Sequence, residues 1–178
     1  MSELPHLALS VRQPWAWAIL HGGKIIENRS AGAIRSGGMT TGTICLHAAS
    51  GMTEAEYQWG VWRLQRHGVT APRPDSLPRR AIIGTVEVVD IIDRSDSEWF
   101  GGEMGLVLEN PRAIDPIPAK GKLGYFEWNA GGSLAPVLPW MRAYDRPGGD
   151  DGTLPLFPDL DQSFRTDPSK PIGTGRKA

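Results

Sequence analysis

The sequence predicts an α+β fold built on a small, strongly bent β-sheet or barrel. Its 178 residues fit one domain of ordinary size. Gly (22) and Pro (15) together are well above the roughly 12% of average usage, which favours many turns and short strands over a helical bundle. Residues 81–92 are rich in Ile and Val and too apolar to be exposed on both faces, so we expect them in a central strand.

The first half of the chain predicts two strands around a short helix. Residues 7–11 alternate weakly between apolar and polar side chains, as a short strand does. A helix is expected over 14–21, because the proline that begins it needs no N–H donor in the first turn. Paired glycines end this helix, an extended segment follows over 24–29, and residues 43–49 form the second clear strand.

The second half predicts the longest helix and the rest of the sheet. Thr53 and Glu56 have the spacing of a capping box, and apolar residues at helical spacing follow them. After a proline-rich loop and the central strand, residues 104–109 form another strand, which Asn110-Pro111 is expected to end. Residues 124–128 are the last strand.

Residues 129–178 are expected to be a Gly/Pro-rich C-terminal tail, partly disordered, that follows a domain over 1–128. The tail holds 7 Gly and 7 Pro and shows no sustained periodicity. Its apolar islands at 137–144 and 154–160 are candidates to dock back on the domain. A protein partner bound through this tail is one of the functions that the sequence leaves open.

Composition bounds the partners and the location. The net charge of −1 excludes a general nucleic-acid-coating protein, so any nucleic-acid site must be a local patch. The single cysteine, Cys45, cannot form an intrachain disulfide, and with His47 it makes only a weak metal signal, so we expect no metal and no cofactor. No apolar stretch is long enough to span a bilayer and no signal peptide opens the sequence, which predicts a cytoplasmic protein without a membrane partner.

Residues 12–35 are the most cationic stretch of the predicted domain. They contain Arg12, Lys24, Arg29 and Arg35 against the single carboxylate of Glu27, and such a group could grip phosphate or could be ordinary solvated charge. Glu27 is best interpreted as the ion-pair partner of its cationic neighbours, with general-base chemistry as the second interpretation. A strict strand period would separate Lys24 from Glu27, so a shared site requires Lys24 to lie in the preceding turn.

Four further residues could contact nucleic acid. Gln13 could read a base edge or cap the turn, and Trp15 could stack on a base, although core packing is the stronger interpretation for an indole. Lys120 and Lys122 flank a glycine in a loop that could track a phosphate backbone or simply be solvated.

Ser10 has no evident base beside it in the sequence, so serine-hydrolase chemistry has no support.

Two short motifs link the chain to a known family. Residues 12–15 form an Arg-Gln-Pro-Trp turn, and residues 22–29 follow the pattern Gly-x-Lys-x-x-Glu-x-Arg. These motifs strongly resemble the ASCH domain, which is named for the activating signal cointegrator and includes stand-alone prokaryotic proteins as well as a domain of a eukaryotic coactivator. The resemblance covers roughly residues 7–128, and its other contributing segments are 43–49, 84–90, 105–112 and 120–128.

The resemblance implies a PUA-like β-barrel with two or three flanking helices and a nucleic-acid cleft beside the first helix. We therefore expect a prokaryotic, cytoplasmic module that binds single-stranded RNA or a nucleotide, with single-stranded DNA as an alternative ligand. The expected contacts are Arg12, Gln13, Trp15, Lys24, Arg29, Lys120 and Lys122.

An enzyme is the alternative function. One branch of the family cleaves the acetyl amide of N4-acetylcytidine with a Lys, a Thr and a Glu, and its Thr lies three residues after its Lys. If this chain is such an amidohydrolase, or a ribonuclease, Lys24 and Glu27 are its candidate catalytic residues. Glu27 stands where that branch has its Thr, and this departure argues against hydrolysis.

Overall fold

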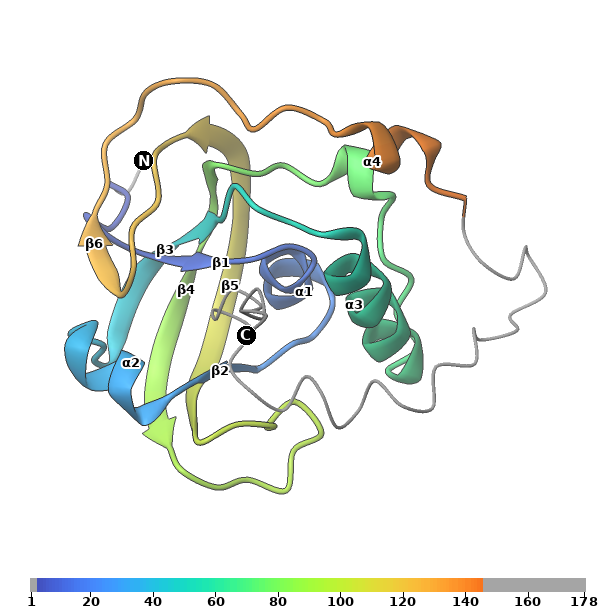
Figure 1. Cartoon of the computed structure of the whole chain (residues 1–178). Coiled ribbons are helices and arrows are strands. Elements are labelled where there is room, and N and C mark those ends of the chain that lie inside the picture. The colour runs from blue at the N-terminus through green and yellow to red at the C-terminus, as the bar shows by residue number, and fades with distance from the viewer. Residues whose placement is uncertain (1–2, 146–178) are drawn as a thin grey trace, which may run out of the picture.

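The structure is a computed structural model and describes residues 3–145. One mixed sheet of six strands curls into a half-barrel (Figure 1), with the strand order β2-β5-β4-β3-β1-β6. Only the pairing of β1 with β3 is parallel among the pairs of this sheet. The strands are β1 (Leu7–Val11), β2 (Ile26–Arg29), β3 (Gly42–Ala48), β4 (Ala81–Ile92), β5 (Met104–Pro118) and β6 (Tyr125–Glu127).

Helices surround this sheet, and the predicted α+β class with a strongly bent sheet is confirmed. The described residues contain four α-helices, where the sequence predicted two or three, and a short 3₁₀ turn. The predicted helices at residues 14–21 and after Thr53 are present, while the two short ones were not recognised. The helices are α1 (Trp15–His21), α2 (Ala31–Ser36), α3 (Glu54–Arg66), α4 (Pro139–Ala143) and the 3₁₀ turn η1 (Pro74–Ser76).

The strand that was expected to stop at Asn110-Pro111 instead continues to Pro118, so that prediction was wrong. Asn110 adopts a left-handed conformation with φ of 49°, which Asn tolerates better than most residues. Its side-chain amide donates to Glu87 Oε2 at 2.8 Å on the neighbouring strand β4. The register between β4 and β5 shifts at three places, and such bulges let a long strand bend without losing its partner.

The first helix closes the concave side of the sheet. Figure 1 shows α1 in front of the sheet between β1 and β2. Its Ala16 and Ile19 are buried in one cluster with inward-facing residues of β1, β3, β4 and β5, such as Leu46 and Leu106. Because this cluster is shared by the helix and four strands, it fixes α1 against the half-barrel.

The longest helix packs on the other side of α1. Thr53 and Glu56 form the predicted capping box, with Thr53 Oγ1 accepting from Glu56 N and Glu56 Oε2 accepting from Thr53 N. Tyr57, Val61 and Leu64 are the buried stripe of α3, and they share a second apolar cluster with Ala18 of α1. The sequence pattern therefore predicted both the start and the buried face of this helix.

Part of the predicted tail belongs to this second cluster. Met141 is fully buried and Tyr144 is 6% exposed, and the Tyr144 ring meets Tyr57 edge-on with centroids 4.9 Å apart. The apolar island at 137–144 thus docks on α3, as expected of a candidate to pack back on the domain. The second island, at 154–160, and the predicted disorder lie outside the described residues.

Candidate nucleic-acid interface

The backbone between α1 and β2 decides where Lys24 lies. Gly23 has a φ of +69°, a conformation open to glycine at little cost, and the N–H of Lys24 donates to Ala18 O of α1 at 3.1 Å. The strand β2 begins only at Ile26, so Lys24 lies in the turn before it. The sequence analysis required Lys24 to lie in the turn before the strand, and this position is confirmed. From there the Lys24 side chain can contact Glu27, three residues later.

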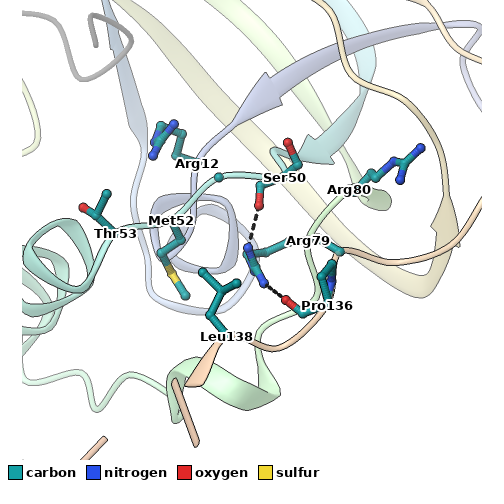
Figure 2. Close-up of a pocket in the computed structure, with 10 residues that line it drawn as sticks. Arg12, Ser50, Met52, Thr53, Arg79, Arg80, Pro136 and Leu138 are labelled. Atoms are coloured by element: carbon teal, nitrogen blue, oxygen red, sulfur yellow. Dashed lines mark hydrogen bonds between the residues drawn. The ribbon is translucent and has the colours of Figure 1, made fainter. Parts of the chain in front are cut away.

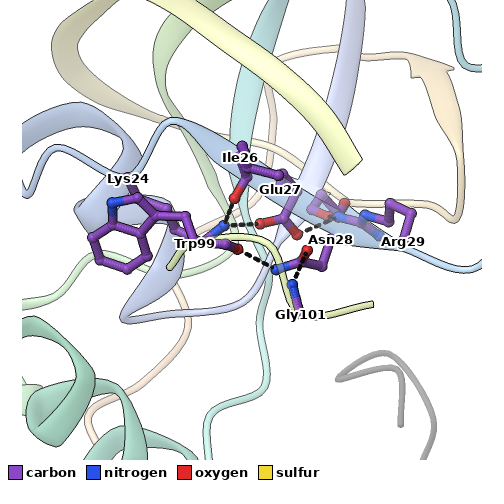
Figure 3. Close-up of polar contacts among 8 residues, drawn as sticks. Lys24, Ile26, Glu27, Asn28, Arg29, Trp99 and Gly101 are labelled. Carbon is purple, nitrogen blue, oxygen red and sulfur yellow. Dashed lines mark hydrogen bonds and ion pairs between the residues drawn. The ribbon is translucent and has the colours of Figure 1, made fainter. Parts of the chain in front are cut away.

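Lys24, Glu27 and Arg29 form a buried ion triad (Figure 3). Glu27 Oε2 lies 2.9 Å from Lys24 Nζ, and Glu27 Oε1 lies 3.1 Å from an Arg29 guanidinium nitrogen. The side chains of Lys24, Glu27 and Arg29 are only 5%, 8% and 10% exposed. Lys24 Nζ also donates to the carbonyl oxygen of Ile26. Glu27 is thus the ion-pair partner of both cations, as its first interpretation held.

Burial changes the acidity of Lys24. Desolvation lowers the pKa of the Lys24 ammonium below its usual value, and this effect exceeds the opposing attraction of Glu27. Arg29 and Arg63 act in the same direction as burial because both are cations. The low exposure of the ammonium, 5%, explains why desolvation outweighs the attraction of the carboxylate.

Arg29 connects the triad on β2 to the backbone of β1. One guanidinium nitrogen donates to the carbonyl oxygen of Ser10 at 2.8 Å, which joins two strands that are not hydrogen-bonded neighbours in the sheet. Arg29 Nε is buried and has no hydrogen-bond partner among the described residues. The motif arginine therefore helps to close the open side of the half-barrel.

A loop between β4 and β5 covers Lys24. Asn28 holds this loop on both sides, since its Nδ2 donates to Trp99 O at 2.8 Å and its Oδ1 accepts from Gly101 N at 3.0 Å (Figure 3). The Trp99 ring stacks on His67, the residue after α3, with centroids 4.0 Å apart. Lys24 consequently lies inside the molecule and not on a surface groove.

Ser10 has a base beside it after all. Ser10 and His47 are paired in the parallel register of β1 and β3, and Ser10 Oγ lies 3.0 Å from His47 Nδ1. His47 Nε2 lies 3.0 Å from Ala119 O, which can only accept, so Nε2 carries the hydrogen and Nδ1 accepts from the serine. Burial lowers the pKa of His47, with the Ala119 carbonyl opposing it, and this favours the neutral ring.

The connection from β5 to β6 passes directly over this Ser10–His47 pair. A Cβ at Gly121 would lie 2.5 Å from His47 Cε1 and 2.7 Å from Ser10 Oγ, so only glycine fits there without a shift. Gly124 in turn contacts Gly37, the residue after α2, and Tyr125 N donates to Gly37 O at 2.8 Å. The loop 119–124 and the end of α2 therefore lie side by side.

These contacts assemble a cationic face, which we define by Arg29, Arg35, Lys120 and Lys122. Lys120, Lys122 and Arg35 are exposed, whereas Arg29, with its side chain 10% exposed, contributes its charge from the inside of this face, where it donates to Ser10 O. The two segments that carry the face, residues 28–53 and 116–126, contain no Asp or Glu. At its border, Glu103 accepts from the backbone N–H of Ala31 at the start of α2. Arg35 was noted in the cationic stretch but was not among the expected contacts.

The remaining expected contacts have structural roles in this fold. Gln13 is fully buried, with its amide donating to Pro78 O at 2.9 Å and accepting from Trp17 N at 2.9 Å, so it caps the turn. Arg12 is ion-paired with Glu56, its Nε lying 2.6 Å from Oε1. Trp15 is half-buried and packs against both large apolar clusters. The structure thus does not bring Arg12, Gln13 and Trp15 together with Lys120 and Lys122.

A pocket of about 420 Å³ lies elsewhere, between the β3–α3 loop and the segment before α4. Figure 2 shows Arg79 in its middle, donating to Ser50 O at 2.5 Å and to Pro136 O. Arg12 and Arg80 also line it, but in Figure 2 their side chains point away from each other. Its arginines therefore do not converge on one anion, and Arg79 serves to tie the C-terminal segment to the domain.

The described residues contain no group of three or more His, Cys, Asp or Glu side chains that could hold a metal ion. Within the same range, none of the helices has the length and apolar character needed to cross a membrane.

Comparison with known proteins places the chain in one family. The model of the ASCH domain matches residues 9–132, which include both motifs, the cationic face and all of the sheet except the first two residues of β1. No curated protein matches the chain. Because the match extends over more than half of the sequence and the fold is a curled α+β sheet, the chain belongs to the ASCH domain family.

Proposed function

We propose that this chain binds single-stranded RNA or a nucleotide through the cationic face of Arg29, Arg35, Lys120 and Lys122. The observation that carries the proposal is the contact between two segments that contain no Asp or Glu. One is residues 28–53, which include α2, and the other is residues 116–126, which pass over the Ser10–His47 pair. Membership in a family that resembles the RNA-binding PUA domains supports the same ligand class. A cytoplasmic location fits this proposal, because the single cysteine, Cys45, is a free and buried thiol.

The charge of this face is sufficient for a local phosphate site. The net charge of the chain is −1, so no long-range attraction of the whole molecule for polyanions is expected. Lys120 and Lys122 are exposed and have no ion-pair partner among the described residues. Neither lysine therefore has to break an ion pair in order to bind a phosphate. Each neutralised phosphate of a single strand adds about 0.7 to the slope of log K against log salt.

The lysine pair provides the test of this proposal. We expect the Lys120→Gln/Lys122→Gln variant to bind a labelled 12-nucleotide single-stranded RNA more weakly and to reduce the log–log salt slope by about 1.4. The measurement is fluorescence anisotropy at several salt concentrations.

A matched control removes the same charge on another side of the molecule. Arg66 at the end of α3 and Arg142 in α4 are both exposed, and Figure 1 shows these helices on the side opposite α2 and β6. The Arg66→Gln/Arg142→Gln variant should leave the salt slope unchanged. Equal changes in both double variants would mean that only net charge matters and would contradict the proposed site.

The buried amine of Lys24 is the observation that favours an enzyme as the second candidate. Burial lowers its pKa, as nucleophilic or basic chemistry requires. However, Lys24 Nζ already donates to Glu27 and to Ile26 O, and both oxygens of the Glu27 carboxylate are held by cations, so neither side chain is free to meet a substrate. The loop pinned by Asn28 covers the site as well.

We therefore expect no release of cytidine from N4-acetylcytidine above the buffer rate when the purified protein is incubated with this nucleoside. Chromatography of the nucleosides over time measures the outcome, with Lys24→Met as the control protein. Turnover by the native chain that Lys24→Met abolishes would place the amidohydrolase ahead of the binding module.

A further inference from the structure

The loop 119–124 presents one apolar side chain almost entirely to solvent. Leu123 is 91% exposed, and the next most exposed large apolar residue of the described chain, Ile25, is 50% exposed. Its neighbours on the N-terminal side are Lys122 and, two residues further, Lys120, both exposed. A leucine at such a position gains nothing for the fold, because it buries almost no surface.

The loop is held down on both sides of Leu123. On one side, Ala119 O accepts from His47 Nε2 at 3.0 Å, and Gly121 packs on the imidazole ring. On the other side, Gly124 has a φ of +70°, and a Cβ there would lie 2.5 Å from Gly37 Cα. Two glycines and a buried histidine therefore fix the backbone, and Lys122 and Leu123 form its outward tip.

We propose that Leu123 contacts the face of an unpaired base in a single-stranded nucleic acid whose phosphates lie against Lys120 and Lys122. This inference rests on the proposed function and adds the residue that senses bases as distinct from phosphates. Bases in a single strand offer apolar faces at the spacing of their phosphates, so an apolar tip beside two cations complements this ligand. The two segments that carry the cationic face, residues 28–53 and 116–126, contain no Asp or Glu, which disfavours a basic protein segment as the partner.

The test compares two ligands and four variants by fluorescence anisotropy: two at Leu123, one control and the lysine double variant. The ligands are the 12-nucleotide RNA and an abasic strand of the same length, which keeps the phosphates but lacks the bases. Leu123→Ala should weaken binding of the RNA by about tenfold without changing the salt slope, and should bind the abasic strand as the native chain does. Leu123→Trp should bind the RNA more tightly than the native chain because an indole stacks on a base.

Leu134→Ala is the matched control, since Leu134 is also an exposed leucine, at 43%, and lies outside the loop. It should bind both strands as the native chain does. If Leu123→Ala binds RNA with native affinity while the lysine double variant binds weakly, the cationic face stands and the role of Leu123 is refuted. If the native chain binds neither strand, both the proposed function and this inference are refuted.

Discussion

Replacing Glu27 with glutamine is expected to lower the free energy of unfolding by about 3–5 kcal/mol, the loss that follows when one partner of a buried ion pair is removed. The reason is that Lys24, 5% exposed, would keep its buried ammonium without a counter-charge. Arg29 would lose the same carboxylate. Urea unfolding followed by tryptophan fluorescence measures the change, since the chain has 7 Trp.

Lys24→Met is the comparison that isolates the cause. It removes the buried ammonium and leaves Glu27 paired with Arg29 at 3.1 Å, so its loss of stability should be clearly smaller than that of Glu27→Gln. Equal losses in the two variants would show that packing, and not the unpaired charge, dominates at this site.

The pH dependence of Glu27→Gln follows from the pKa of Lys24. Because burial lowers this pKa in the folded chain, Lys24 binds its proton more tightly in the unfolded chain, and its contribution to stability rises with pH up to the unfolded value of about 10.4. Glutamine removes the opposing attraction of the carboxylate, so the rise should be steeper than in the native chain. Cys45 and Tyr125, whose pKa values burial raises, affect both proteins alike, so the difference in stability between the native chain and Glu27→Gln is the quantity to follow. A difference that does not shrink between about pH 8 and pH 10 would contradict the assignment.

Replacing Gly60 with alanine is expected to destabilise the chain by about 2 kcal/mol, although alanine is the better helix former by about 1 kcal/mol. Gly60 lies in the middle of α3, and a methyl group there would lie 2.8 Å from Pro14 Cδ and closer still to Cγ. The proline ring is rigid, so α3 would have to move away from the start of α1. The free energy of unfolding in urea measures the effect.

Gly32 in α2 provides the opposite case. A Cβ there would meet nothing closer than Ser30 Oγ at 3.9 Å, so Gly32→Ala should raise the free energy of unfolding by about 0.5–1 kcal/mol through helix propensity alone. If Gly60→Ala raised stability as Gly32→Ala does, the close packing of α3 on Pro14 would be refuted.

The Gly-x-Lys-x-x-Glu-x-Arg motif has a structural role in this chain. Lys24 and Arg29 both hold the Glu27 carboxylate, and Arg29 also bonds to the backbone of β1. Such a network leaves little of the Lys24 ammonium for a ligand. The cations that we assign to binding are therefore mainly those outside the motif, namely Arg35 on α2 and Lys120 and Lys122 on the loop 119–124.

Local sequence signals were sufficient for the elements that depend on neighbouring residues. The spacing of Thr53 and Glu56 satisfies the N–H groups of the first turn of α3, and this needs no distant partner. The β-branched run of β4 predicted a central strand because its burial follows from composition. The requirement that Lys24 precede the strand followed from the two-residue period of β-structure, and the start of β2 at Ile26 meets it.

Tertiary structure decided which charged residues face solvent and which pairs meet. Ser10 and His47 are 37 residues apart and meet only because β1 and β3 pair in parallel register, which no local pattern encodes. Pro111 continues β5 because the bulged pairing with β4 offsets the loss of its N–H. Arg12 and Gln13 became structural because α3 and Pro78 supply their partners. The sequence alone thus determined the family and the class of fold, whereas contacts between distant segments determined which cations make up the cationic face and where it lies.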